Sequence, residues 1–242
     1  MKKQLAILLL LYCWICTSLS GQNYNYAPNS LNIPTIRKRG EVSMGLGYGH
    51  ATNSLDVQLA YSPFKQVLIL GNYFHARNKE VRQQTMNGTD YYFGEAAIGF
   101  YETYKKGVGS ITAGWGNGNL FSNYEMNNSA ELSIQRWFVQ PGFAYQSEFF
   151  HAAVALRFSR LNYTKANVSF SINPSDLAHI QNIEAKNPIL LPELGIQAGI
   201  VFKPVYLGLS ISSIFPDTNL WDFTRLNAAL MLSTTFGTRR KG

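Results

Sequence analysis

The chain has 242 residues, of which 46% are hydrophobic, 14% aromatic and only 14% charged, and its formal net charge is +7. A typical soluble domain is about 25% charged, so this composition disfavours an ordinary fold that faces water on all sides. The basic residues are dispersed or lie near the chain ends, which disfavours nucleic acid as a partner and suits an anionic lipid surface better.

The first 21 residues have the order of a secretory signal peptide. Two lysines follow the initial methionine, an apolar run comes next, and small residues at Ser18 and Ser20 close the segment. The apolar run, roughly ten residues long, is too short for a transmembrane helix, which needs about 20. We therefore expect a signal peptide over residues 1–21, cleaved after Ser20 or Gly21.

Both cysteines of the chain, Cys13 and Cys16, lie in this segment. One interpretation is a lipidated Cys16. The preceding residues, Trp14 and Ile15, are bulky where a lipoprotein signal has small ones, so we favour two cysteines that are discarded with the signal peptide. The mature chain then has no disulfide and no thiol ligand for a metal.

From Glu41 onward, large apolar residues alternate with small or polar ones, which is the period of a β-strand with one apolar face. The other face carries Gly, Ala, Ser, Asn and Gln with about one charge per strand, as in the crowded lumen of a small barrel. We predict ten strands, over residues 41–50, 55–62, 67–76, 91–101, 108–116, 134–145, 149–162, 193–202, 205–213 and 225–236.

The connections alternate in length. Short turns are predicted over residues 62–66, 102–107, 146–148 and 203–204, and long polar loops over residues 77–90, 117–133, 163–192 and 214–224. This alternation is typical of outer-membrane barrels. The predicted fold class is therefore all-β, a single antiparallel transmembrane β-barrel of about ten strands, with short periplasmic turns and long extracellular loops.

The domain organisation follows from these segments. A periplasmic lead over residues 22–40 precedes the barrel, residues 41–236, and a basic tail over residues 237–242 follows it. We expect the protein in the outer membrane of a Gram-negative bacterium, with outer-membrane lipids as partners. Its last strand ends in Phe236 and resembles the strand that barrel-assembly machinery recognises during insertion.

Two stretches, residues 25–49 and 136–163, resemble a family of outer-membrane beta-barrel proteins of Bacteroidetes, some of which carry lipoprotein signals. The family shares a Tyr-x-Pro-Asn-x-x-Asn-x-Pro opening and a Gly-Glu pair at the first strand. These residues are Tyr26, Pro28, Asn29, Asn32, Pro34, Gly40 and Glu41. The resemblance implies the fold and the location, and no established activity.

Charged residues on the small face of the strands form the first candidate site. They are Asp56, Glu95, Arg136, Arg157 and Glu193. One interpretation is a charged constriction that selects ions or solutes. The other, which we favour, is a network that fills a narrow lumen and pairs charges that would be costly to bury alone.

A second candidate is an enzymatic site at the long-loop rim, formed by His50, His75, Asp56 and Asp90. A histidine base needs a partner within hydrogen-bond reach, and we favour the simpler view that these are polar interface residues. The predicted role is a non-enzymatic scaffold, narrow pore or surface-binding protein. The alternatives are an outer-membrane hydrolase that uses this rim site and a soluble lipocalin-like barrel that binds lipid.

Metals and cofactors are not expected. Once Cys13 and Cys16 are discarded with the signal peptide, no His or Cys pair is left at a close ligand spacing. The glycine-rich run at residues 114–119 is not followed by a convincing helix, as a phosphate cradle requires. The loop over residues 163–192 contains a helix-start pair, Asn173 and Pro174. A short helix there could cover the barrel mouth or bind an extracellular ligand.

The segment from Arg136 to Phe158 is predicted to form two adjacent strands, with Arg136, Gln140, His151 and Arg157 in the lumen. Pro141 lies within one of them. Proline gives no N–H to a strand ladder and avoids interior strands, so we predict a bulge or a weak point in the wall there.

Overall fold

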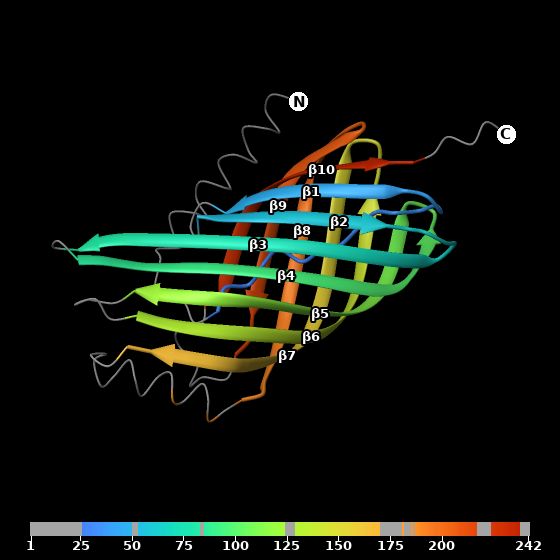
Figure 1. The fold of residues 1–242 in the computed structure, drawn as a ribbon. Coiled ribbons are helices and arrows are strands. Elements are labelled where there is room, and N and C mark those ends of the chain that lie inside the picture. Colours follow the sequence, from blue (N-terminus) through green and yellow to red (C-terminus); the bar gives the residue numbers. More distant parts are fainter. Residues whose placement is uncertain are drawn as a thin grey trace.

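The computed structural model describes residues 26–49, 53–82, 85–123, 129–169, 181, 185, 187–216 and 224–237. Ten antiparallel strands close into one barrel, in which neighbours in sequence pair and β1 pairs with β10 (Figure 1). The predicted all-β class and the closed antiparallel barrel of ten strands are confirmed. Among these residues, no helix is both long and apolar enough to cross a membrane.

The strands differ in length. They are β1 Val42–Gly49, β2 Ser54–Tyr61, β3 Val67–Arg82, β4 Thr85–Tyr104, β5 Gly107–Asn123, β6 Ser129–Gln146, β7 Phe150–Val168, β8 Ile189–Phe202, β9 Val205–Ile214 and β10 Leu226–Phe236. Strands β3 to β7 extend beyond the others on the left of Figure 1, at the long-loop end. The long loops predicted over residues 77–90 and 117–133 are therefore wrong in extent, since most of each is strand, and the loop predicted over residues 163–192 begins and ends in strand.

The physical reason is an inversion of polarity along the long strands. Near the short turns, the outward side chains are apolar, such as Val154 and Phe158 of β7, whereas further along β7 Arg160 and Asn162 point outward and Leu161 inward. The outward residues change from aromatic to polar at one level of the barrel. The pairs on either side of this level are Tyr73 and His75, Tyr92 and Asp90, Trp115 and Asn117, Trp137 and Gln135, and Phe158 and Arg160. The period of two continues past this level with a mostly polar outer face, on which Phe121 of β5 is an exposed apolar exception.

The polarity of the inward side chains changes in the opposite direction, from polar at the middle of the barrel to apolar at the long-loop end. At the long-loop end the barrel encloses an apolar core, with Phe74, Tyr91, Leu132 and Leu161 almost fully buried. At the middle of the barrel the buried residues are instead Asp56, Glu95, Arg136 and other polar groups. The half of the barrel near the short turns thus has an apolar outside and a polar inside, as a membrane barrel has, and the half near the long loops has the reverse, as a water-soluble barrel has.

Pro141 does not produce a bulge. The register of β6 with β5 runs without a break through Ile111 and Pro141. On the other side, Val139 pairs with Phe158 and Gly142 with Ala155, so the register is unchanged although no pairs form at the two residues between them. Of the two predicted alternatives, the bulge is wrong and the weak point is confirmed as a local gap in the β6–β7 ladder. The register shift between these strands lies at Ser133/Ile134.

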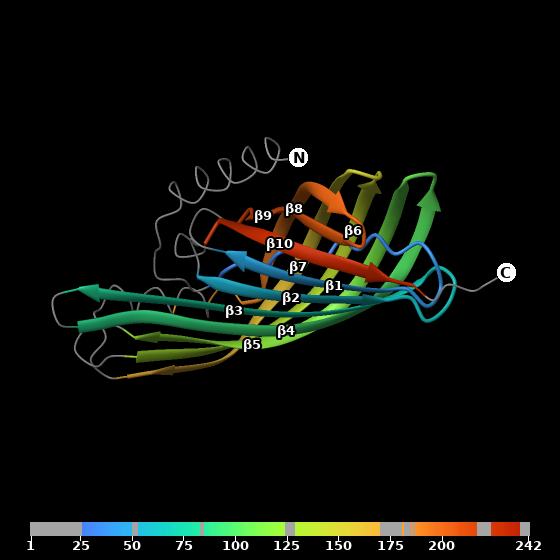
Figure 2. The ribbon, with the colours of Figure 1, turned by 90° about the horizontal axis from the view of Figure 1, so that it is seen from above.

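The described part of the lead lies inside the barrel, which corrects the prediction of a periplasmic segment in front of it. Residues 26–34 and Ile36 are buried. Tyr26 is at the long-loop end, where its carbonyl accepts a hydrogen bond from the Thr224 amide at 2.9 Å. Arg37 is at the short-turn end, where it donates to the Lys105 carbonyl at 2.6 Å, and the lead then joins β1 (Figure 2). The spacing of apolar residues in the lead does not predict this path, because the lead contacts strands that are far from it in the sequence.

Candidate functional site

Three charged side chains from three strands meet in the middle of the lumen. The Glu95 carboxylate of β4 accepts a hydrogen bond from the Arg136 guanidinium of β6 and, at 3.0 Å, one from Arg157 of β7. All three side chains are 1% exposed. The guanidinium centres also lie over aromatic rings, Arg136 over Phe93 at 4.5 Å and Arg157 over Phe138 at 4.3 Å, where cation–π attraction adds to the ion pairs.

The other two predicted network residues lie beside this centre. Glu193 of β8 lies 3.7 Å from Arg136 and also accepts a hydrogen bond from the Ser159 hydroxyl. Asp56 of β2 contacts the lead, since its carboxylate accepts hydrogen bonds from the Ser30 amide at 3.1 Å and the Ser30 hydroxyl at 3.0 Å. The sequence-predicted network is thus one cluster of four charges and one separate carboxylate that binds the lead.

Side chains of the lead complete this cluster. Asn29 accepts a hydrogen bond from Arg136 at 2.8 Å and, through its amide nitrogen, approaches Glu95 at 3.4 Å. The Tyr26 hydroxyl accepts a hydrogen bond from Arg136. Burial raises the pKa of this hydroxyl above its ordinary value, so Tyr26 is a neutral partner. Asn32 donates to the Asn72 amide oxygen at 2.7 Å, and Asn72 in turn donates to Glu95.

The backbone of the lead is held by amide side chains from four different strands. These bonds run from Asn227 to the Pro28 carbonyl at 3.0 Å, from Gln58 to Ser30 at 2.9 Å, from Gln197 to Leu31 at 2.8 Å, and from Gln140 to Asn32 at 2.8 Å. Buried carbonyl groups need such partners. An extended segment with no strand beside it can obtain them only from side chains, which explains why the lumen is rich in Asn and Gln.

Glycines of the wall make room for the lead. A Cβ added to Gly195 of β8 would lie 2.8 Å from the Leu31 side chain, closer than packed side chains allow. A Cβ on Gly142 of β6 would lie 3.4 Å from Ile33. The wall and the lead therefore fit each other at van der Waals distance as well as through hydrogen bonds.

The arrangement favours a structural role for the lumen charges. The two arginines and Glu95 are fully buried and paired, and the lead lies against them, so little of this cluster is accessible to a passing ion. A selectivity constriction instead presents its charges to the solute. The geometry is that of a plug bonded to the barrel wall.

The structure brings together two of the four predicted rim residues, His75 and Asp90. His75 Nε2 lies 2.7 Å from Asp90 Oδ1, and the side chains are 36% and 40% exposed, on the outer face of β3 and β4. Arg77 approaches the same carboxylate at 3.8 Å. Asp56 points into the lumen, on the opposite face of the wall, and His50 is outside the described residues. His179, Asn173 and Pro174 are also outside them, as are Cys13, Cys16 and the signal peptide.

Within the described residues, no three His, Cys, Asp or Glu side chains are grouped in a way that could hold a metal ion. The lead residues of the site, Tyr26, Asn29 and Ser30, were not predicted as functional. A signal existed in the Tyr-x-Pro-Asn-x-x-Asn-x-Pro motif, because polar residues at fixed spacing in a segment without periodicity indicate specific contacts elsewhere in the fold.

No protein-family model matches the chain, and no curated protein matches it. Among solved structures, LpxR from Salmonella typhimurium is similar to the chain with a TM-score of 0.37 and 7% sequence identity. The match covers 82% of this chain and all of the LpxR chain. What stands from the structure itself is a closed barrel of the outer-membrane type, with an apolar outer belt and a polar lumen.

Proposed function

We propose that the protein is a non-enzymatic outer-membrane barrel, closed to solutes by its own lead, which holds an extended polar β-wall outside the membrane as a binding surface. The observation that carries this proposal is the buried lead, with Asn29 bonded between Arg136 and Glu95 at the centre of the lumen. A pore needs an open path there. A plugged barrel with long outward-facing polar strands is suited to a scaffold or surface-binding role.

The outer belt supports insertion into a membrane. Its apolar side chains run along β6 from Trp137 to Tyr145, both of them exposed. A transmembrane β-strand needs about 9–11 residues, and this segment has that length. Aromatic side chains at its two ends match the girdles found where barrels meet headgroups.

A matched pair of substitutions on β7 tests the belt. Val154→Arg places a charge at the middle of the apolar face and is expected to lower the free energy of unfolding in lipid vesicles by about 2–4 kcal/mol. Asn162→Arg places the same charge on the same face above the belt and is expected to change it by less than about 0.5 kcal/mol. Denaturant titration of the refolded barrel measures both. Equal effects of the two substitutions would contradict the assigned belt.

The closed lumen is tested by conductance. The purified wild-type protein in planar bilayers is expected to give no channel steps, and antibodies to the extended wall are expected to label intact cells. Steady conductance by the wild type would overturn the plugged scaffold in favour of a pore.

The two alternative functions receive less support. The hydrolase would need a site that gathers His50, His75, Asp56 and Asp90, and Asp56 lies on the other face of the wall from His75. A lipocalin-like barrel would turn its apolar face inward throughout, whereas residues such as Leu156 and Ile196 point outward. Lipid and peptide hydrolysis at the level of a protein-free blank, in the wild type and in His75→Ala alike, is the expected result for a non-enzymatic barrel.

A further inference from the structure

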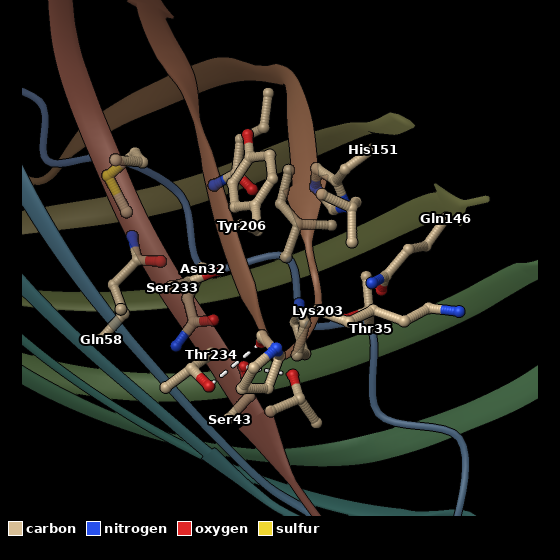
Figure 3. A pocket seen from close by; sticks show the side chains of 18 residues that line it. Asn32, Thr35, Ser43, Gln58, Gln146, His151, Lys203, Tyr206, Ser233 and Thr234 are labelled. Atoms are coloured by element: carbon tan, nitrogen blue, oxygen red, sulfur yellow. Dashed lines mark hydrogen bonds between the residues drawn. The ribbon is translucent and has the colours of Figure 1, made fainter. Parts of the chain in front are cut away.

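The barrel wall is hollowed on both of its faces. On the inside, a cavity of about 310 Å³ near the short turns is lined mainly by amide and hydroxyl side chains, such as those of Asn32, Gln58 and Thr234 (Figure 3). On the outside, a groove of about 670 Å³ is lined by residues of β5 to β8. The lining of this outer groove is mostly apolar, and its volume is within the range of small-molecule sites, about 300–1,000 Å³.

The outer groove is formed by outward side chains of different size. Ala113 of β5 pairs with Val139 of β6, and both side chains are small. Three aromatic residues lie next to them, namely Trp115, Trp137 and Phe158. The two indole rings lie 6.3 Å apart between centroids, and Trp137 and Phe158 are each 57% exposed. Exposed apolar surface around a hollow indicates a site where another apolar group binds.

The long-loop side of the groove carries an unpaired positive charge. Arg160 of β7 lines the groove and is exposed, and its guanidinium has no ion-pair or hydrogen-bond partner among the described residues. Its neighbours across the ladder are Trp137 and Leu190, and no carboxylate is among the described residues that line the groove. Phe158 and Arg160 lie on either side of the level at which the outward side chains become polar. The groove therefore extends from the apolar belt to a cation.

We propose that this groove binds one molecule of an anionic phospholipid, with its phosphate at Arg160 and an acyl chain over Val139 and Phe158. The inference rests on the membrane insertion proposed above, which places the groove where acyl chains meet headgroups. Charge complementarity selects the lipid, because guanidinium and phosphate form charge-assisted hydrogen bonds and no carboxylate of the groove competes for Arg160. A zwitterionic lipid gains less from Arg160, because its own positive group already neutralises its phosphate.

Tryptophan fluorescence reports on this groove directly, since Trp115 and Trp137 line it. Of the other two tryptophans, Trp14 lies in the predicted signal peptide, so Trp221→Phe in the mature protein leaves only those of the groove. This protein is inserted into phosphatidylcholine vesicles that contain a small fraction of phosphatidylglycerol or phosphatidylcholine with brominated acyl chains, which quench tryptophan on contact. The relative binding constant of phosphatidylglycerol is expected to be about fivefold higher, the factor that one arginine contributes near an anionic lipid.

Two pairs of substitutions separate the groove from a general attraction of lipid to the protein. Arg160→Gln is expected to remove the preference for phosphatidylglycerol, whereas Arg77→Gln, which removes the same charge from the outer face of β3, is expected to keep it. Val139→Phe fills the groove and is expected to remove the preference although Arg160 remains. Val154→Phe adds the same bulk to the belt outside the groove and is expected to keep the preference. Each variant is first shown to be folded by its heat-modifiable migration.

Two results overturn the proposal while the membrane insertion stands. One is equal quenching by the two brominated lipids in the Trp221→Phe protein. The other is an unchanged preference in Val139→Phe, because Arg160 then attracts lipid without the groove. If neither brominated lipid quenches the tryptophans, the belt is not in contact with acyl chains, and the membrane insertion and this proposal are overturned together.

Discussion

Replacing Glu95 with glutamine is expected to lower the free energy of unfolding by about 3–5 kcal/mol, the cost of removing one partner from a buried ion pair. Glu95 is the one carboxylate in the described residues that bonds to both lumen arginines. In its absence Arg136 keeps Glu193 at 3.7 Å, but Arg157 keeps only neutral partners such as Gln140 at 2.9 Å. One buried positive charge is then left without a counter-charge.

Glu131→Gln on the outer face of β6 provides the control, because it removes the same charge where water solvates it. Its expected effect is within about 0.5 kcal/mol. Denaturant titration followed by tryptophan fluorescence, in vesicles of one composition, measures both variants. If Glu95→Gln is as stable as Glu131→Gln, the lumen charges do not hold the barrel together.

The barrel could be predicted because its determinants are local. Alternation of apolar and small residues along Val42 to Gly49 or Ser54 to Tyr61 gives both the strand and its two faces. Arg136, Arg157 and Glu95 could be assigned to the lumen by the same parity. The parts of β3 to β7 nearest the long loops were predicted as loops. The alternation continues there but its outer face is polar, so the search for outward apolar residues that identified the strands assigned these parts to polar connections.

The plug could not be predicted in the same way. Residues 26–36 have no period, and their hydrogen-bond partners lie on seven strands, up to Asn227 near the other end of the chain. The match between wall and lead is visible only in space: Gly195 is small because Leu31 lies against it, and Asn29 is polar because two arginines face it.

Displacing the lead is expected to open the lumen to ions. Deletion of residues 26–36 removes every hydrogen bond that the plug makes with Asp56, Glu95 and Arg136, and the purified variant is expected to show discrete conductance steps in planar bilayers where the wild type is silent. The charged cluster then lines the path. Arg136→Gln in the deleted background removes one of its two positive charges and is expected to shift the selectivity toward cations.

Because the deletion also removes neutral hydrogen-bond partners of the buried charges, a second variant keeps the whole chain. Gly195→Leu places a side chain where a Cβ alone would lie 2.8 Å from Leu31, so the lead must move away from β8. Gly94→Leu adds the same side chain on the outer face of β4, where nothing lies within 4 Å of a Cβ. If Gly195→Leu conducts ions and Gly94→Leu does not, the lead is what closes the lumen in the wild type. Heat-modifiable migration in gels shows that each variant is folded. The two leucine variants differ only in whether the added side chain enters the space that the lead occupies. If all the folded variants, including the deletion, fail to conduct, the wall side chains alone close the lumen and the lead is not the block.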